Sequence, residues 1–422
     1  MKSIIIHPHH LEGTIKVPTS KSLAHRAIIC ASLSKGESVI TNVSMSLDIE
    51  ATINAMRALG ATIISQGTTL YINGNQTLTE KNCLIDCHES GSTLRFMIPV
   101  SLINERFVTF TGRGKLGSRP LDVYYNIFDK QGINYTYGKD VLDLKINGAL
   151  QAGEFSIPGD ISSQFITGLL FALPLCQGDS TIHITSPLQS KGYIDLTLDL
   201  LKLYGITIEN DDYETFTIKG SQAYIAHDYE VEGDFSQAAN YLAAGAMGNE
   251  VLITNLNLQS AQGDRAAIKI LESMGAHLEE TSEGVLMRPG RLQATNIDAS
   301  QCPDIIPVMA AVCGVAQGTS LIYNAKRLRI KECDRLHATC EVLKACGVMV
   351  AEKEDAMVIT GTDFVQGAEL SCFNDHRMAM MEAILATRAY GDFKLDDASC
   401  VAKSYPDFFE DYQKLGGSFD EC

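Results

Sequence analysis

Residues 326–335 hold the densest group of chemically active side chains in the sequence. They contain five cations and two acids, whereas the chain of 422 residues carries a net charge of −17. If residues 331–335 open a helix, Lys331 and Arg335 project from one face of its first turn because they are four residues apart. Glu332 lies between them. The segment is then either a solvated helix start, as most charge runs are, or an anion pocket with its own proton donor.

Further cations lie beside short polar turns. Lys21 and Arg26 flank the start of an apolar segment, where they could hold a phosphate or a carboxylate or belong to a solvated helix cap. Arg119 ends a basic loop, residues 111–120, and the proline after it favours an extended backbone that suits a bidentate clamp on a carboxylate. A GxGxxG match in this loop is not interpreted as a dinucleotide motif, because no strand ending in an acid follows at the required distance.

The remaining candidates are polar or acidic. Residues 162–164 and Ser190 offer uncharged hydrogen bonds to a polyhydroxylated or phosphorylated ligand, although both segments would also serve as helix caps. Asp304 stands at a polar turn, where a carboxylate most often caps its own helix. Arg377 and Lys403 add two cations near the C-terminus.

These residues belong to a chain with internal repeats. Six glycines, separated by 69 to 73 residues, each end a helical segment and precede a strand-like pattern. Glycine at the end of a helix adopts a left-handed conformation without a steric penalty. The six are Gly60, Gly132, Gly205, Gly275, Gly347 and Gly416.

A second landmark recurs in step with the glycines: a polar turn followed by an alanine-rich apolar helix. The turns are residues 20–22, 89–92, 162–164, 234–236, 302–304 and 374–376. The pattern predicts six copies of a βα unit of about 70 residues, three in each of two globules, with a boundary between residues 226 and 231. Helix N-termini bind anions, so their convergence would build an electropositive cleft on an acidic protein.

Composition limits the possible functions. The 45% apolar content is typical of a globular protein. No stretch approaches a membrane span and the N-terminal apolar run is too short for a signal peptide, so we expect a cytoplasmic protein. The twelve cysteines lie mostly in apolar patterns and are predicted to be reduced core residues. Cys83, Cys87 and His88 do not match a zinc spacing, so no metal is expected. Acidic charge argues against nucleic acid but allows a small phosphorylated metabolite.

In combination and order, these motifs resemble the EPSP synthases (3-phosphoshikimate 1-carboxyvinyltransferases), members of the enolpyruvyl transferase family. The resemblance covers essentially the whole chain. It rests on residues 20–22 with Arg26, 90–92 with Arg95, Arg119 with Pro120, 162–165, 329–336, 374–379 and Lys403. It implies an α/β (α+β) fold of two globular domains, each of three βαβαββ repeats (an inverse α/β barrel), with an interdomain cleft. The expected domains are residues 19–228, and residues 1–18 with 229–422.

The resemblance also implies a reaction: the enolpyruvyl group of phosphoenolpyruvate moves to the 5-hydroxyl of shikimate 3-phosphate and phosphate is released, in the shikimate pathway to chorismate and aromatic amino acids. The residues implied for shikimate 3-phosphate are Lys21, Ser22, Arg26, Ser162, Ser163, Gln164, Ser190, Asp304 and Lys331. Those implied for phosphoenolpyruvate are Lys21, Gly91, Arg119, Gln164, Arg335, Arg377 and Lys403. Catalytic roles are implied for Asp304, which takes the hydroxyl proton, for Glu332, which protonates the methylene carbon, and for Lys21. No cofactor and a monomer are expected.

The charge count agrees with this expectation. The two substrates carry roughly −5 to −6 in total. Seven cations of the implied site match that charge: Lys21, Arg26, Arg119, Lys331, Arg335, Arg377 and Lys403.

Two positions depart from the family pattern, and two alternatives remain. Glu89 and Arg327 each stand where the family commonly has asparagine. A UDP-N-acetylglucosamine 1-carboxyvinyltransferase would share the fold, but it usually carries a cysteine in the loop before Arg–Pro, where Gly114 stands here. A non-catalytic anion-binding protein is the other alternative, although it would not need both Asp304 and Glu332.

Overall fold

The computed structural model describes residues 3–139 and 141–422 and divides into two compact units. The first unit is Lys21–Val231, and the second combines the described residues up to Ser20 with Glu232–Cys422. The boundaries expected from the sequence differ from these by two residues at the first crossing and three at the second.

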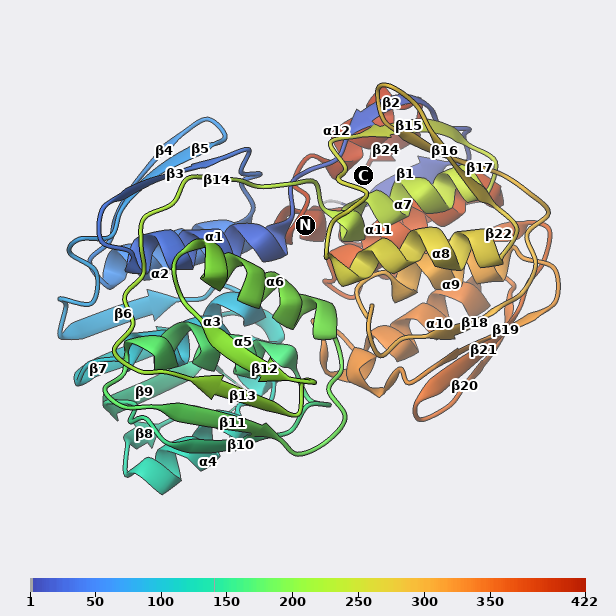
Figure 1. Ribbon diagram of the computed structural model, residues 1–422. Helices are drawn as coiled ribbons and strands as arrows, with labels where there is room; N and C mark the ends of the chain where they lie inside the picture. Colours follow the sequence, from blue (N-terminus) through green and yellow to red (C-terminus); the bar gives the residue numbers. More distant parts are fainter. Residues whose placement is uncertain (1–2, 140) are drawn as a thin grey trace. The chain divides into compact units, whose positions relative to one another are not determined.

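The first unit contains three four-stranded sheets with helices between their strands (Figure 1). Its elements are α1 (Lys21–Leu33), β3 (Glu37–Thr41), α2 (Leu47–Ala58), β4 (Thr62–Gln66), β5 (Thr69–Asn73), β6 (Asn82–Asp86), α3 (Gly91–Ser101), β7 (Arg106–Thr111), η1 (Gly114–Ser118), α4 (Asp122–Gln131), β8 (Asn134–Thr136), β9 (Asp143–Gly148), β10 (Glu154–Ile157), α5 (Ser163–Ala172), η2 (Leu173–Leu175), β11 (Ser180–Ile184), α6 (Lys191–Leu203), β12 (Ile208–Asp211), β13 (Thr215–Ile218) and β14 (Tyr229–Glu230).

The second unit repeats this organisation with three further four-stranded sheets. Its elements are β1 (Ile4–His7), β2 (Glu12–Lys16), α7 (Phe235–Ala246), β15 (Glu250–Thr254), η3 (Gly263–Arg265), α8 (Ala266–Ser273), β16 (His277–Glu280), β17 (Val285–Arg288), β18 (Asn296–Asp298), α9 (Ile306–Gly314), β19 (Thr319–Tyr323), η4 (Lys326–Ile330), α10 (Arg335–Ala345), β20 (Met349–Glu352), β21 (Ala356–Thr360), β22 (Val365–Leu370), α11 (His376–Leu385), η5 (Ala386–Arg388), β23 (Ala389–Leu395), η6 (Ala398–Lys403), α12 (Phe408–Lys414) and β24 (Ser418–Glu421).

One sheet shows the repeat in its simplest form. β6 runs parallel to β7, as a βαβ crossover through α3 requires, and β7 and β8 each pair antiparallel with β9. In chain order this is β6-α3-β7-α4-β8-β9. The βαβαββ repeat predicted from the sequence is therefore confirmed.

The N-terminal strands complete sheets of the second unit. β1 pairs antiparallel with both β23 and β24, and β2 pairs parallel with β15. Two of the three sheets of the second unit are therefore completed by the first residues of the chain: β1 lies inside one sheet, and β2 forms the edge of another. In the first unit, β14 plays the same role by pairing parallel with β3.

Two kinds of helix position the polar turns. All nine residues of α9 are buried, as expected of a helix that is apolar on every side. All twelve residues of α7 are buried as well, including the polar side chains of Gln237 and Asn240. These two helices pack against each other and against α11, while α1, α3 and α5 occupy the corresponding places in the first unit. The outer helices, such as α4 and α6, bury one face only. Each unit has its own hydrophobic core.

All six repeat glycines adopt the predicted left-handed backbone. Their φ angles lie between 67° and 107°. They follow α2, α4, α6, α8, α10 and α12 and precede the next strand in each case. The sequence prediction of six helix C-caps is confirmed.

The predicted helix start at residues 331–335 is wrong. Residues 326–330 form the short 3₁₀ helix η4, Lys331 is extended with ψ −156°, and α10 begins only at Arg335. The physical reason is Asp334, whose carboxylate accepts the main-chain N–H of His337 at 3.0 Å. A capping residue has a non-helical backbone, so the helix starts after it.

The cysteines behave as predicted. All twelve are free thiols, and only Cys422 is exposed. None of the helices within residues 3–139 and 141–422 is long and apolar enough to cross a bilayer.

Candidate functional site

The predicted site residues form two groups, one in each unit. The first-unit group gathers at the starts of α1, α3, α5 and α6, and the second-unit group at the starts of α7, α9, α10 and α11 together with η6. Each group is described within its own unit.

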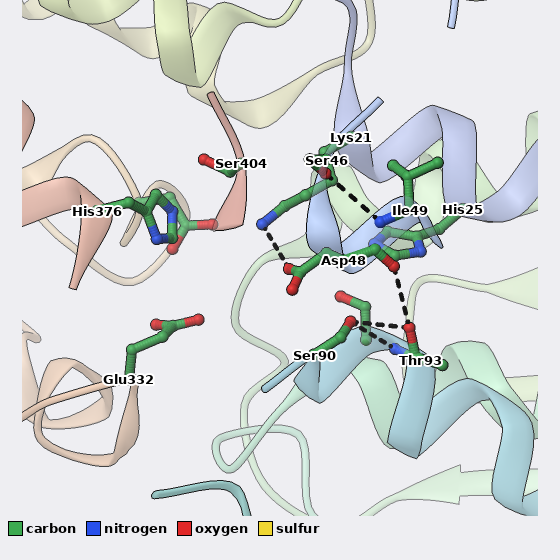
Figure 2. Close-up of polar contacts among 12 residues, drawn as sticks. Lys21, His25, Ser46, Asp48, Ile49, Ser90, Thr93, Glu332, His376 and Ser404 are labelled. Carbon is green, nitrogen blue, oxygen red and sulfur yellow. Dashed lines mark hydrogen bonds and ion pairs between the residues drawn. The ribbon is translucent and has the colours of Figure 1, made fainter. Parts of the chain in front are cut away.

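Lys21, the first residue of α1, points at a carboxylate that the sequence interpretation missed (Figure 2). Its Nζ lies 2.8 Å from Oδ2 of Asp48 in the first turn of α2. The hydroxyl of Thr93 donates to the main-chain oxygen of Asp48 at 3.4 Å and lies 2.8 Å from Oγ of Ser90. The position of Asp48 is therefore fixed from α3. Acids are common in the first turn of a helix, so its sequence signal is weak.

Arg26 is buried and held by neutral acceptors. Its Nε donates to Oγ1 of Thr197 at 2.8 Å, Nη1 to the main-chain oxygen of Ser22 at 2.7 Å and Nη2 to that of Tyr193 at 2.9 Å. The rings of Phe96 and Tyr193 lie 5.3 and 5.9 Å from the guanidinium carbon. Burial lowers the pKa of Arg26 to about 10. No carboxylate of the described residues forms an ion pair with it, so it offers a buried positive charge to an anionic ligand.

Gln164 is oriented by α3. Its Oε1 accepts from Nη1 of Arg95 at 2.8 Å, and its Nε2 donates to Oγ of Ser92 at 2.9 Å. Ser162, which caps α5, accepts the main-chain N–H of Gln164 at 3.3 Å. The side-chain amide of Gln164 and the helix start are thus held in one arrangement.

Gly91 and Arg119 are in direct contact. A Cβ atom at Gly91 would overlap the Arg119 guanidinium, so this cation lies against the N-terminal residue of α3. Ser190 precedes α6 with a φ of 59° and is buried, while Ser163 is buried at the start of α5. Most predicted residues of the first unit therefore lie at helix starts, whereas Arg26 lies one turn into α1 and Arg119 follows η1.

One guanidinium organises the second-unit group. Arg335 is 1% exposed and contacts three carboxylates. Its Nη1 lies 2.8 Å from Oδ1 of Asp304, its Nη2 2.6 Å from Oε2 of Glu332, and its Nε 2.7 Å from Oδ2 of Asp375. Nη2 also donates to Oδ1 of Asp375 at 3.2 Å. Lys331 adds a second cation, with Nζ 3.1 Å from Oδ1 of Asp304.

Asp304 does not cap its helix. α9 begins at Ile306, and no side chain caps it. The carboxylate instead faces the cations, because Lys331 in the segment before α10 and Arg335 at the first position of α10 both contact it. The simpler interpretation of Asp304 as a helix cap is therefore wrong.

The charges in this cluster shift one another's pKa values. Burial alone would raise the pKa of Asp304, but the positive charges of Lys331, Arg335 and Arg377 outweigh it and hold that pKa well below its usual range. Burial lowers the pKa of Lys331 despite the nearby Asp304 carboxylate. Burial would also lower the pKa of Arg335, yet Asp375, Glu332 and Asp304 raise it well above its usual value. Asp304 is ionised at neutral pH.

Arg377 and Lys403 complete the second-unit group. Arg377 donates through Nη1 to the main-chain oxygen of Ser236 at 3.0 Å and through Nη2 to Oγ of the same residue at 2.7 Å. Lys403, at the end of η6, donates to the main-chain oxygen of Asn374 at 2.5 Å. Asp375 caps α11 by accepting the N–H of Arg377 at 2.9 Å. The starts of α7 and α11 and the end of η6 are linked in this way.

The charge count made from the sequence was incomplete. It set seven cations against the expected substrates, but Lys21, Lys331 and Arg335 pair with carboxylates of the protein. Asp48 and Asp375 were absent from that count. An anionic ligand that binds these cations must compete with the acids already there.

The structure also shows the surroundings of Glu89 and Arg327, the two residues that depart from the family pattern. Glu89 lies against Gly114, since a Cβ atom there would overlap its carboxylate. Arg327 is buried in η4, and its charge adds to the burial that lowers the pKa of Lys331. In the part of the chain that the structure describes, no three His, Cys, Asp or Glu side chains are grouped so as to hold a metal ion.

Comparison with known proteins gives consistent results. The sequence model of the EPSP synthase (3-phosphoshikimate 1-carboxyvinyltransferase) family matches residues 5–412. A 3-phosphoshikimate 1-carboxyvinyltransferase of Clostridium perfringens (strain 13 / Type A) is 52% identical over 423 residues, covering 100% of both chains. One of Clostridium botulinum (strain Alaska E43 / Type E3) is 50% identical over 428 residues, covering 100% of this chain and 99% of the relative.

Two solved structures share the fold. EPSP synthase from Acinetobacter baumannii superposes with a TM-score of 0.83 at 22% identity and covers 100% of both chains. The enolpyruvyl transferase NikO from Streptomyces tendae gives a TM-score of 0.80 at 17% identity, covering 100% of this chain and 99% of that one.

Proposed function

The chain belongs to the EPSP synthase (3-phosphoshikimate 1-carboxyvinyltransferase) family, and we propose that Asp304 and Glu332 carry its proton transfers. The protein is an enzyme of the shikimate pathway to aromatic amino acids. It transfers the enolpyruvyl group of phosphoenolpyruvate to shikimate 3-phosphate and releases phosphate. The observation that supports the proposal is that one buried guanidinium, that of Arg335, contacts both acids.

In the proposed mechanism, the 5-hydroxyl oxygen of shikimate 3-phosphate attacks C2 of phosphoenolpyruvate and loses its proton to Asp304. Glu332 gives a proton to C3, which yields a tetrahedral intermediate. Loss of a proton from the new methyl group and departure of phosphate then form the product, so atoms and charge balance. Asp304 suits the first step because the cations around it keep it ionised.

Substrate binding would also strengthen Asp304 as a base. Lys331 pairs with Asp304 in this structure, and we assign it to the substrate phosphate. A phosphate that draws Lys331 away from Asp304 removes a positive charge from the carboxylate, and its pKa rises toward the value that proton abstraction needs.

We assign the remaining predicted residues by their chemistry. The group for shikimate 3-phosphate comprises Lys21, Ser22, Arg26, Ser162, Ser163, Gln164, Ser190, Asp304 and Lys331. The group for phosphoenolpyruvate comprises Lys21, Gly91, Arg119, Gln164, Arg335, Arg377 and Lys403. Arginines with fixed guanidinium planes bind carboxylate and phosphate by paired hydrogen bonds, and several such cations stabilise the charge of the departing phosphate.

We also propose that the two units are the two substrate-binding domains of a monomeric cytoplasmic enzyme. All the assigned residues come from one chain, and both units contribute to each substrate in the assignment. Lys21→Gln in the first unit and Lys403→Gln in the second should therefore each weaken phosphoenolpyruvate binding.

The reaction is tested by phosphate release. The purified protein should release phosphate from phosphoenolpyruvate only when shikimate 3-phosphate is present. Release with UDP-N-acetylglucosamine instead would assign the protein to the other carboxyvinyltransferase.

The acid and base are tested by Asp304→Ala and Glu332→Ala. Each should lower kcat about 10²- to 10⁴-fold, while calorimetry still detects binding of both substrates. Glu279→Gln, which removes an acid from an exposed ion pair of the same unit, should leave kcat unchanged. Turnover at the wild-type rate in both alanine variants would remove Asp304 and Glu332 from the mechanism.

A further inference from the structure

A polar cavity lies in the second unit, away from the helix starts that carry the site. Its volume is about 660 Å³, within the range of small-molecule sites. It is lined by residues 246–248 at the end of α7, 315–318 at the end of α9, the turns 289–292 and 361–363, and Arg388 of η5. Because α7 has twelve residues, its end lies about 18 Å from its start. No residue of the site described above lines this cavity.

Arg388 is held rigidly at the cavity. Its Nη1 donates to the main-chain oxygen of Met247 at 3.1 Å and its Nη2 to that of Asp363 at 2.9 Å. The ring of Phe364 lies 4.7 Å from the guanidinium carbon. These contacts come from two segments, residue 247 and residues 363–364, so the guanidinium is preorganised and needs little ordering when a ligand arrives.

Arg291 and Asp363 give the cavity one further charge of each sign. Both are exposed. Among the described residues, neither the Arg291 guanidinium nor the Asp363 carboxylate takes part in a hydrogen bond or an ion pair. Asp363 accepts a hydrogen bond from Arg388 through its main-chain oxygen, which leaves its carboxylate available. Two arginines, Arg291 and Arg388, and one aspartate, Asp363, thus line the same space.

The helix ends bring main-chain carbonyl groups to the cavity, some of which already accept hydrogen bonds, and the walls add apolar residues. The last carbonyl groups of a helix carry partial negative charge, and both α7 and α9 end at the cavity. Met247, Leu292 and Val315 also line the cavity; Leu292 is partly exposed, and the other two are buried at its wall. A simple anion would meet the carboxylate and the carbonyl groups, and a simple cation would meet the arginines. A ligand with both charges on neighbouring atoms and an apolar remainder satisfies all three features.

We propose that this cavity binds a free α-amino acid with an apolar side chain. Arg291 and Arg388 take its carboxylate, because guanidinium groups bind carboxylates through paired hydrogen bonds. The Asp363 carboxylate and the carbonyl groups at the ends of α7 and α9 take its ammonium group. The side chain lies against Met247, Leu292 and Val315. This site is independent of the enolpyruvyl transfer.

Ligand analogues test the recognition of both charges. L-Phenylalanine and L-leucine are titrated into the full-length protein by calorimetry at millimolar concentration, and at least one should bind. For the amino acid that binds, removing the ammonium group (3-phenylpropanoate or 4-methylpentanoate) or the carboxylate (2-phenylethylamine or 3-methylbutylamine) should weaken binding at least tenfold. Failure of both amino acids to bind at 10 mM, or equal binding of either analogue, would overturn the proposal.

Variants locate the binding in this cavity. Arg291→Gln and Asp363→Asn should each weaken amino acid binding at least tenfold and leave enolpyruvyl transfer at the wild-type rate. Both positions are exposed, so folding is preserved. Lys269→Gln removes a cation from the exposed face of α8 in the same unit and should change neither quantity. Wild-type affinity in Arg291→Gln and Asp363→Asn would place the amino acid elsewhere and overturn the assignment.

Discussion

Replacing Asp375 by asparagine tests how much the Arg335 cluster contributes to stability. Asp375 is fully buried. It accepts from Nε and Nη2 of Arg335 at 2.7 and 3.2 Å and also caps α11. Asparagine has the same shape and keeps one oxygen, which can still cap the helix. Its amide group, however, presents a donor to a guanidinium that has only donors.

The expected loss follows from these contacts. Removing one partner of a buried ion pair costs about 3–5 kcal/mol. The N-cap, worth about 1 kcal/mol, is kept, and Arg335 retains Asp304 and Glu332 as counter-charges. We therefore expect the free energy of unfolding to fall by about 3 kcal/mol for Asp375→Asn, which is more than a hundredfold change in the ratio of folded to unfolded protein.

Urea unfolding followed by far-ultraviolet circular dichroism measures this change. Urea is preferred to guanidinium chloride because salt screens the charges under test. The control is Glu279→Gln, which breaks the exposed pair between Glu279 and Arg288 (2.5 Å) in the same unit and should cost less than about 1 kcal/mol. A loss in Asp375→Asn no larger than in this control would refute the role assigned to the buried cluster.

Three further predictions follow from other features. The cations beside Asp304 lower its pKa in the folded protein. Its contribution to stability is therefore present above about pH 4 and is lost as the pH falls further, because the unfolded chain takes up the proton first. Urea unfolding between pH 3 and 6 should show a shallower decline of the unfolding free energy in Asp304→Asn than in the wild type. Gly91→Ala should move the Arg119 guanidinium that lies against it and raise the KM for phosphoenolpyruvate in steady-state assays, with little change in stability because the end of a flexible side chain yields. Gly132→Ala places a Cβ in open space at a φ of 67° and should cost about 1 kcal/mol of unfolding free energy. In Gly60→Ala the new Cβ also overlaps a main-chain oxygen, so the loss in the same measurement should be clearly larger. Equal losses would show that φ alone decides the cost.

Local sequence signals determined the repeat structure of this protein. A glycine that ends a helix and a polar residue that starts one act through the backbone of a few neighbouring residues. Gly205 and Gly347 could therefore be identified as C-caps, and Ser162 and Asp375 lie at helix starts found from the same polar turns. The reduced state of the cysteines followed from their apolar surroundings in the sequence.

Only the tertiary structure decided which charges neutralise one another. Asp304 and Asp375 are 31 and 40 residues from Arg335, and Asp48 is 27 residues from Lys21. Pairing over such separations depends on how α9, α10 and α11 pack, and on the place of α2 beside α1, which no local pattern specifies. The same is true of the cavity at Arg388, whose walls come from five separate segments. Backbone conformation is fixed mainly by neighbours in sequence, whereas the partner of a side chain is fixed by neighbours in space.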